Sequence, residues 1–253
     1  MRITYACLIY KSVRYLKFVY EEFHKYTKLN DGDEFYFVAN DACEEVLNFL
    51  VQNNIKHYIH NNTQEQRKEW YINNVYRAWN TAAKMAKGDY IIFLNSDFGF
   101  SDSWSENLQK YIDNNKCICS RLVERGPLDG GMPSGKYGIE KSFGNTTFNY
   151  RSNEFNEYVK TIQEDNLYPG GLYMPLLIKK SHLELVNYYP EGNIVSGSNI
   201  FNPNIITKEQ SQLGIPLIPG DIVLMEKLRL HGIEHYTCFN SIVYHFQEGE
   251  MRE

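Results

Sequence analysis

The chain has 253 residues, which corresponds to one or two domains at about 150 residues per domain. Apolar residues make up 43% and charged residues 23%, close to the globular average, so a disordered or low-complexity chain is excluded. The 26 Lys and Arg against 31 Asp and Glu give a net charge of −5. Without a basic block, the charge disfavours binding by phosphate neutralisation, and we expect no nucleic-acid partner.

The sequence also indicates in which cellular compartment the protein is expected. No run of 18 apolar residues occurs, so we expect no transmembrane segment, which still leaves room for peripheral membrane contact. The apolar segment 3–10 runs directly into Lys11 and lacks a small-residue cleavage site, which disfavours a secretory signal. The five cysteines are scattered and lack CxxC spacing. Free thiols in a reducing compartment are the simplest interpretation, and we expect a cytoplasmic protein.

The first half of the chain alternates between expected strands and expected helices. Strands are expected at residues 3–10, 34–39, 55–59 and 90–94. Amphipathic helices are expected around residues 15–23, 46–50 and 65–86. Strands and helices that alternate across short polar connections are typical of a mostly parallel central sheet with helices on both faces. The sequence therefore predicts an α/β fold.

The second half is less regular. Glycines, prolines and charges interleave over residues 124–153, and a second irregular stretch covers residues 190–204. Such long loops more often form a working surface than a mere connection, and we expect both on the acceptor side. The expected regular elements are helices at 153–164, 181–187 and 221–230 and strands at 171–178 and 237–245. No repeat or long linker divides the chain, so we expect a single domain.

Polar groups follow three of the expected strands. They are Lys11-Ser12, Asn40-Asp41 and Asn95-Ser96-Asp97. In open parallel sheets ligands bind beyond the carboxyl ends of the strands. Asp97 is the sharpest of these signals, because a carboxylate at the end of a buried strand is placed to hold Mg²⁺ or Mn²⁺ against a diphosphate. The alternative is that Asp97 only caps the next helix or starts a turn.

Several motifs together resemble one enzyme family. Residues 88–97 read Gly-Asp-Tyr-Ile-Ile-Phe-Leu-Asn-Ser-Asp and are followed by Trp104. Further matching groups are Tyr10, Asn80, Gly170-Gly171, Pro219-Gly220-Asp221 and Val243-Tyr244-His245. In this order and spacing they are similar to the family 2 glycosyltransferases of GT-A fold, whose central motif is an apolar strand followed by D-x-D. The resemblance implies one GT-A (nucleotide-diphospho-sugar transferase) domain over 1–253, with a nucleotide-binding half at 1–120 and an acceptor-binding half at 121–253.

The resemblance also implies roles for donor-binding residues. Tyr10 and Asp41 would line the base and ribose pocket, and Asn80 matches the family's Ala-Arg-Asn. Asp97 would bind the metal that bridges the phosphates of a nucleotide-diphosphate sugar. Asn95 stands where the family usually has an aspartate, and its amide can still bind hydroxyl groups but brings no charge.

His245 and Asp221 complete the implied site. His245 would be the second protein ligand, and imidazole beside carboxylate favours Mn²⁺ over Mg²⁺. Its alternative is a satisfied histidine at a strand end. Asp221 would be the catalytic base that takes the proton of the acceptor hydroxyl, and its alternative is an N-cap for the following helix. One base and one metal suffice for an inverting single displacement.

The resulting hypothesis is a metal-dependent inverting glycosyltransferase that moves a sugar from a nucleotide-diphosphate sugar to a carbohydrate or lipid-linked acceptor in glycan or polysaccharide biosynthesis. Two alternatives stay open. Asn95 and Gly220 stand where acids are expected, which would suit a non-catalytic nucleotide-sugar or glycan-binding module of the same fold. A sugar nucleotidyltransferase has a similar sheet, but it usually carries a Gly-rich basic loop after the first strand, which Tyr10-Lys11-Ser12 lacks.

Overall fold

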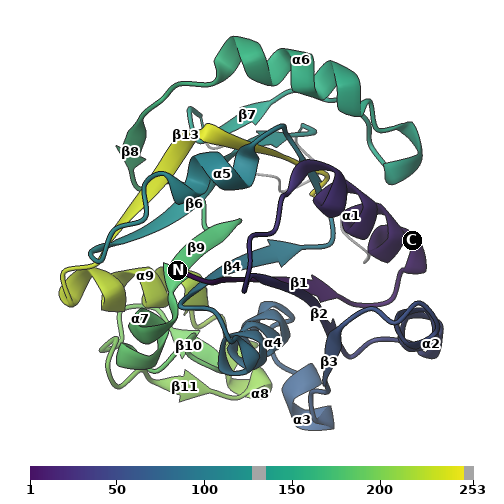
Figure 1. Ribbon diagram of the computed structural model, residues 1–253. Helices are drawn as coiled ribbons and strands as arrows, with labels where there is room; N and C mark the ends of the chain where they lie inside the picture. The colour runs from purple at the N-terminus through teal and green to yellow at the C-terminus, as the bar shows by residue number, and fades with distance from the viewer. Residues whose placement is uncertain (127–134, 248–253) are drawn as a thin grey trace.

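A computed structural model describes residues 1–126 and 135–247, and in this part of the chain one large sheet forms the centre of the molecule (Figure 1). Its strand order is β3-β2-β1-β4-β9-β6-β13-β5, and β7 and β8 pair with β6 and β13. The strands of this sheet are β1 Ile3–Ile9, β2 Glu34–Asn40, β3 His57–His60, β4 Tyr90–Asn95, β5 Phe98–Phe100, β6 Lys116–Glu124, β7 Gly138–Glu140, β8 Leu167–Pro169, β9 Leu176–Lys179 and β13 Glu234–His245.

The sheet is mostly parallel. β3, β2, β1 and β4 run parallel to one another, as do β6 and β13. β9 lies antiparallel between β4 and β6 and so joins the two parallel sets, which therefore point the same way. All seven residues of β1 are buried, as expected for a strand covered on both faces. The predicted α/β class and the mostly parallel sheet are confirmed.

Helices cover both faces of the sheet. They are α1 Val13–Tyr26, α2 Glu44–Gln52, α3 Gln64–Arg67, α4 Ile72–Met85, α5 Trp104–Gln109, α6 Ser152–Ile162, α7 Lys180–Leu185, α8 Lys208–Ser211 and α9 Gly220–Leu230. On one face Tyr5 of β1 packs edge-on against Phe23 of α1 and Trp104 of α5. On the other face the Tyr36 hydroxyl of β2 donates to the Ala82 carbonyl of α4 over 2.6 Å. Figure 1 shows α1 and α5 on the opposite side of the sheet from α4 and α9.

Two predicted elements differ from the structure. The helix expected over 65–86 is divided into α3 and α4, because Thr63 and Gln66 close a capping box around α3 and the Trp70 amide binds the Asn193 side chain at 3.0 Å. The strand expected at 171–178 begins only at Leu176. Gly170 and Gly171 have φ values of 76° and 124°, which a regular strand does not allow.

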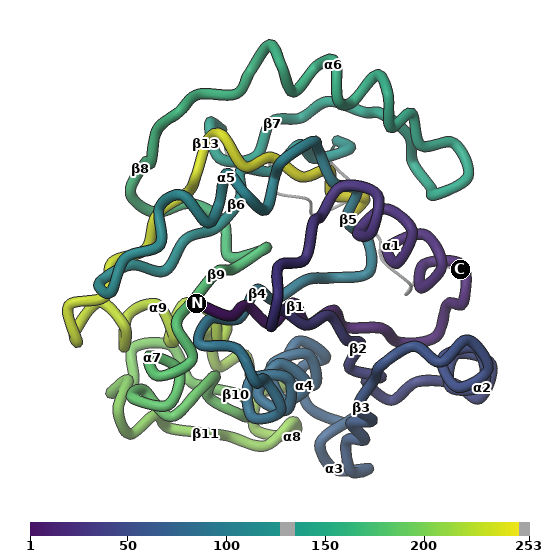
Figure 2. Tube along the Cα trace, in the orientation of Figure 1, coloured from purple at the N-terminus to yellow at the C-terminus, as the bar shows by residue number. Residues whose placement is uncertain are grey.

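The irregular stretches contain short elements of their own. Residues 190–218 form a second, three-stranded sheet with the order β11-β10-β12, made of β10 Asn193–Val195, β11 Ile205–Ile206 and β12 Leu217–Ile218. The stretch 124–153 contains β7 and a 3-10 turn, Thr147–Asn149, while its residues 127–134 lie outside the described residues. The chain trace in Figure 2 shows the small sheet beside α4 and α9.

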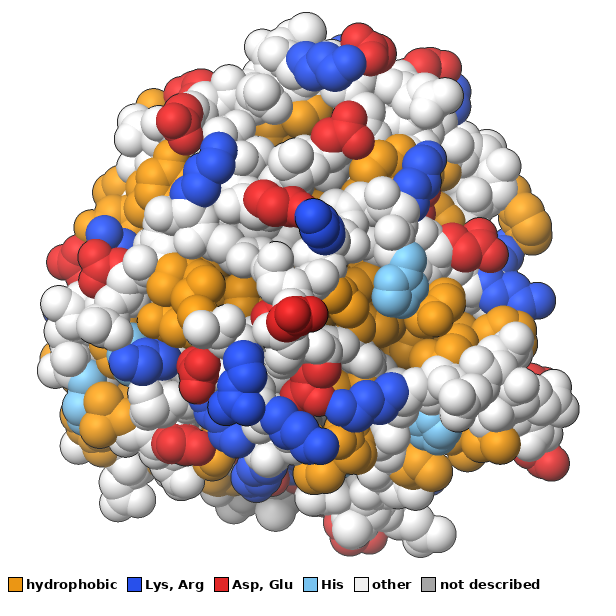
Figure 3. Space-filling model, viewed as in Figure 1, with side chains coloured by type: hydrophobic (Ala, Val, Ile, Leu, Met, Phe, Trp, Pro, Cys, Tyr) orange, Lys and Arg blue, Asp and Glu red, His pale blue; other side chains and the backbone are white. Residues whose placement is uncertain are grey.

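Charged side chains of both signs are spread over the surface. Figure 3 shows acidic and basic side chains intermixed over most of the face seen in Figure 1. The net charge of −5 is therefore not gathered into one patch on that face. Among the helices of the described residues, none has both the length and the apolar character needed to cross a bilayer.

Candidate active site

The carboxyl ends of the parallel strands bring most of the predicted site residues to one edge of the sheet. Tyr10 follows β1, Asp41 follows β2, and Asn95 ends β4. His245 ends β13, which runs parallel to β6 and hence to β4. Because parallel strands end at a common edge, residues far apart in the sequence meet there.

Asp97 and His245 are in direct contact. Nε2 of His245 lies 3.2 Å from Oδ2 of Asp97, and its Nδ1 lies 3.0 Å from Oε2 of Glu124. The side chains of Asp97 and Glu124 are 9% and 6% exposed, so both carboxylates are withdrawn from water. The Phe246 amide donates to the Asp97 carbonyl at 3.1 Å and fixes the two loop ends together. The side chains of Asp97, His245 and Glu124 are therefore already held in contact with one another.

The two carboxylates dominate the electrostatics around His245. Burial by itself lowers the pKa of the His245 imidazole, but Asp97 and Glu124 outweigh burial and raise that pKa to about 10. The imidazole is therefore protonated at neutral pH and donates from both ring nitrogens. Protonation balances part of the negative charge at the end of the sheet.

The donor set fits a divalent cation only in part. A carboxylate oxygen of Asp97 and an imidazole nitrogen of His245 lie 3.2 Å apart, and these atom types suit Mn²⁺. Among residues 1–126 and 135–247, however, no group of three or more His, Cys, Asp or Glu side chains could hold a metal ion. The chain thus offers two ligands, and other positions would be filled by phosphate oxygens or water.

Asp41 is held in a polar cradle after β2. Its Oδ1 accepts from Nη2 of Arg67 at 2.5 Å and from the Asn62 amide at 2.9 Å, and the Asn62 side chain donates to Oδ2 at 2.8 Å. Burial raises the pKa of Asp41, but the bonds from Arg67 and Asn62 outweigh it and hold that pKa below its usual value. Tyr10 directly follows β1, which pairs in parallel with β2 up to the register of Ile9 with Ala39. Tyr10 and Asp41 therefore lie at the ends of two adjacent strands, and their role in a base and ribose pocket stays a prediction.

Asn80 has a different setting. Its Nδ2 donates to the Tyr189 carbonyl at 2.9 Å and to Oε1 of Glu191 at 3.0 Å, and its Oδ1 accepts from the Tyr189 amide at 2.9 Å. The buried side chain is thus engaged in holding the loop that leads into the small sheet. These contacts do not bring Asn80 to the other predicted donor residues.

Asp221 lies in the first turn of α9. The residue at the N-cap position is Pro219, and Asp221 accepts from the adjacent Ile222 amide at 2.7 Å, so the alternative of an Asp221 N-cap is wrong. Its carboxylate faces an aromatic cluster, and the Tyr76 and Tyr173 hydroxyls lie within its electrostatic range. Burial raises the pKa of Asp221 above its usual value. A carboxylate with a raised pKa is suited to accept a proton.

Sequence reasoning missed Glu124. It ends β6, and its strand pairs in register with β13, so that Glu124 lies beside His245. Ser120 and Arg121 interrupt the apolar residues before Glu124, so no uninterrupted apolar strand of the kind that identified Asp97 precedes this acid. Glu124 also opens the irregular stretch 124–153, and no local pattern separates it from that stretch.

The fold and the site together define an α/β protein with a preorganised acid–histidine–acid chain at the carboxyl edge of its sheet. Residues 39–163 match the model of glycosyl transferase family 2. This segment contains Asp41, Asp97 and Glu124, while Asp221 and His245 lie beyond it. The match supports the expected glycosyltransferase, and the predicted resemblance to family 2 is confirmed. No curated protein matches the chain.

Solved structures with a similar fold are glycosyltransferases. The chain is 14% identical to residues 1–349 of TarS from S. aureus, with a TM-score of 0.57 over 97% of this chain and 60% of that one. A mannosyltransferase from Pyrobaculum calidifontis in complex with GDP-Man and Mn²⁺ is 13% identical, with a TM-score of 0.57 over 96% of this chain and 56% of that one.

GalNAc-T7 with UDP, GalNAc and Mn²⁺ is 13% identical, with a TM-score of 0.58 over 97% of this chain and 44% of that one. At these identities the comparison establishes the GT-A fold. The chain spans at most 60% of the length of these three structures.

Proposed function

We propose that the chain is a metal-dependent inverting glycosyltransferase, which moves a sugar from a nucleotide-diphosphate sugar to a hydroxyl acceptor in glycan or polysaccharide biosynthesis. The observation that supports it most directly is the contact of His245 with both Asp97 and Glu124 at the carboxyl edge of the sheet. The neighbours crystallised with GDP-Man and Mn²⁺ or with UDP and Mn²⁺ have the same fold.

In this proposal Asp97 and His245 hold the cation, with Mn²⁺ favoured over Mg²⁺ by the imidazole. When bound, the cation would supply positive charge to the departing diphosphate. Nε2 of His245 would give up the proton that it now shares with Asp97, since a metal ligand must be neutral. Asp41 and Tyr10 would bind the base and ribose, and Asn95 would bind hydroxyl groups of the donor.

Asp221 acts on the acceptor in the proposed reaction. It takes the proton of the acceptor hydroxyl as that oxygen forms a bond to the anomeric carbon, and the bond from this carbon to the diphosphate oxygen breaks. The attack from the face opposite the diphosphate inverts the anomeric configuration. The raised pKa of Asp221 is in keeping with this role, because it makes the carboxylate a better proton acceptor.

The two halves of the chain divide the work in this proposal. Residues 1–120 bind the donor, and residues 121–253 form the acceptor side and supply Asp221. Glu124 and His245 come from the second half but reach the donor edge through β6 and β13. The five cysteines are all free, which supports a reducing, cytoplasmic location.

The test is an assay of donor hydrolysis and sugar transfer across UDP- and GDP-sugars, with Mn²⁺, Mg²⁺ or EDTA. We expect turnover with Mn²⁺ and its loss in EDTA. Asp221→Asn should lower kcat by at least about 100-fold, since removal of general acid–base catalysis costs about 10² to 10⁴. Asp102→Asn, an exposed acid elsewhere, serves as the control.

Full activity of Asp221→Asn would contradict the assignment of the base, and a product with retained anomeric configuration, read by NMR, would contradict the single displacement. Nucleotide-sugar binding without any turnover would identify the non-catalytic module instead. Release of pyrophosphate from a nucleoside triphosphate and a sugar phosphate would identify the nucleotidyltransferase.

A further inference from the structure

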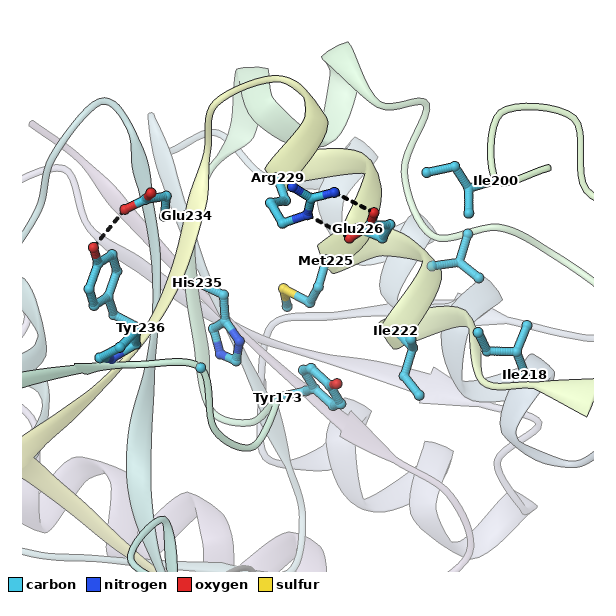
Figure 4. A pocket seen from close by; sticks show the side chains of 13 residues that line it. Tyr173, Ile200, Ile218, Ile222, Met225, Glu226, Arg229, Glu234, His235 and Tyr236 are labelled. Atoms are coloured by element: carbon cyan, nitrogen blue, oxygen red, sulfur yellow. Dashed lines mark hydrogen bonds and ion pairs between the residues drawn. The ribbon is translucent and has the colours of Figure 1, made fainter. Parts of the chain in front are cut away.

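A cavity of about 570 Å³ lies between α9, the start of β13 and the connection from β8 to β9. Figure 4 shows the side chains of Tyr173, Ile222 and Met225 gathered in the space between α9 and β13. Ile200 and Ile218, from the stretch that carries the small sheet, close its far side. The cavity is therefore lined by four segments from the second half of the chain.

The cavity begins beside the proposed catalytic base. Ile222 is the next residue after Asp221 in α9, and both Ile222 and Tyr173 line the cavity. The Asp221 charge acts on the Tyr173 hydroxyl, which places the carboxylate near this end. Asp221 does not itself line the cavity, but the next residue does, so a molecule in the cavity lies beside the first turn of α9.

One part of the cavity lining is aromatic and uncharged. The rings of Tyr173 and His235 stack with centroids 5.6 Å apart and planes inclined by 26°. Burial lowers the pKa of His235 to about 4, so this ring is neutral at pH 7. Flat, neutral aromatic side chains offer apolar faces with a polar edge, which suits the C–H face of a sugar ring.

Another part of the lining is apolar. Ile200, Ile218 and Ile222 form this part. Two of the charged lining residues, Arg229 and Glu226, are joined by two hydrogen bonds of 2.8 and 2.7 Å and neutralise each other. A further lining acid, Glu234, accepts a hydrogen bond of 2.6 Å from the Tyr236 hydroxyl. The cavity therefore offers no unpaired charge from Arg229 and Glu226 to an ionic ligand, and its isoleucines favour an apolar group.

We propose that this cavity binds the acceptor, and that the acceptor is a glycoside with an apolar aglycone: its sugar lies against Tyr173 and His235, and its aglycone lies against Ile200, Ile218 and Ile222. The inference rests on the proposed function for the role of Asp221. It adds the acceptor class, which the donor-side residues do not define.

The test compares octyl and methyl β-D-glycosides of glucose, galactose and N-acetylglucosamine as probes of the wild-type protein and two variants. Binding is measured by ligand-observed NMR and by calorimetry. We expect at least one octyl glycoside to bind about tenfold or more tightly than its methyl counterpart, because each buried methylene group contributes roughly fourfold. Ile200→Ser and Ile218→Ser should each reduce this octyl-to-methyl ratio by about threefold or more.

Leu213→Ser is the matched control. Leu213 lies between α8 and β12, is 78% exposed and does not line the cavity. The octyl-to-methyl binding ratio of this variant should therefore stay at the wild-type value. Equal binding of octyl and methyl glycosides, or an octyl preference that both isoleucine variants retain, would overturn the inference.

Hydrolysis of a nucleotide sugar by water is measured in parallel on the wild-type protein. A wild-type protein that hydrolyses donor but shows no octyl preference refutes the cavity assignment alone. An octyl preference without any donor turnover upholds apolar binding in the cavity but refutes its role as an acceptor site together with the proposed function.

Discussion

Asp97 bears an unusual share of the proposed metal binding. Asn95, two residues earlier, brings an amide where the family usually has a carboxylate, so the central motif supplies one negative charge. The second protein ligand, His245, depends on its own neighbours, because it must give up a proton to bind a cation. This dependence places Glu124, which touches His245 at 3.0 Å, in a positioning role.

Glu124→Gln tests that role. The amide can still contact Nδ1 of His245 but loses the negative charge, so Mn²⁺ affinity in the presence of UDP or GDP should fall about tenfold, in line with other carboxylates that orient metal-binding histidines. Mn²⁺ titration followed by electron paramagnetic resonance measures this affinity without reference to turnover. Glu140→Gln on the neighbouring strand β7, an exposed position in register with Glu124, is the control. Equal Mn²⁺ affinity in wild type and Glu124→Gln would exclude the positioning role.

Glu22 affects stability in a pH-dependent way. Its side chain lies in the buried face of α1, Oε2 has no hydrogen-bond partner, and burial raises the pKa of Glu22 from 4.5 to about 7. The folded state therefore prefers the protonated acid. Its ionisation lowers stability as pH rises from about 4.5 to about 7, by on the order of 3 kcal/mol in total.

Glu22→Gln should therefore be more stable than the wild type at pH 8 and gain no such advantage at pH 4.5. Urea unfolding at both pH values measures the difference. Glu21→Gln, the exposed neighbour on the same helix, should leave the pH dependence unchanged. An identical slope of unfolding free energy against pH in Glu22→Gln and wild type would show that Glu22 does not titrate between the two states.

The position of a single residue at the end of a strand could be predicted where the signal is local, but its contacts with distant residues could not. Asp97 could be identified because an acid follows a run of apolar residues in one segment. Its contact with His245 and Glu124 depends on the pairing of β6 with β13, more than 100 residues apart. No local pattern encodes that register. Asn80 illustrates the converse, since a motif match alone did not reveal its bonds to the 189–191 loop.

At the scale of elements, α9 depends on close packing at its first residue. A Cβ atom added at Gly220 would lie 2.8 Å from two ring carbons of Tyr76 in α4. The position that holds an acid in the resembling family is therefore unavailable to a side chain here. Gly220 allows α9 to approach α4, and the same approach brings Asp221 to the Tyr76 hydroxyl.

Gly220→Ala should lower the unfolding free energy by about 1 to 3 kcal/mol, the usual cost of overpacking. Chemical denaturation gives the value, and the double variant Gly220→Ala with Tyr76→Leu provides the check. Because the smaller side chain relieves the contact, the double variant should be less destabilised than the sum of the two single variants. Additive losses would indicate that Gly220 and Tyr76 do not constrain each other.

Elements with a clear hydrophobic period were predicted close to their observed bounds. The helix expected at 221–230 corresponds to α9, and the strand expected at 237–245 begins three residues earlier as β13. Elements whose bounds depend on distant contacts were not predicted at their observed bounds. The division between α3 and α4 depends on Asn193, over 120 residues away, which binds the Trp70 amide.

At the scale of the whole molecule, the order of strands follows from two kinds of information. The alternation of strands and helices in the first half indicates the parallel set β3-β2-β1-β4. The insertion of β9 between β4 and β6, and the return of β13 to pair with both β6 and β5, could not be read from periodicity. These late strands complete the sheet and deliver His245 to the donor edge, so the sequence predicted the fold class more fully than the assembled site.

The proposed function depends most on a cation held by Asp97 and His245 against a diphosphate, and calorimetry of UDP and GDP binding tests this directly. Wild type should bind at least one of the two at least about tenfold more tightly with Mn²⁺ than in EDTA, since the cation neutralises the diphosphate at the two ligands. Asp97→Ala should bind equally weakly under both conditions. Mn²⁺-independent binding by the wild type, or Mn²⁺-dependent binding that survives in Asp97→Ala, would contradict the account.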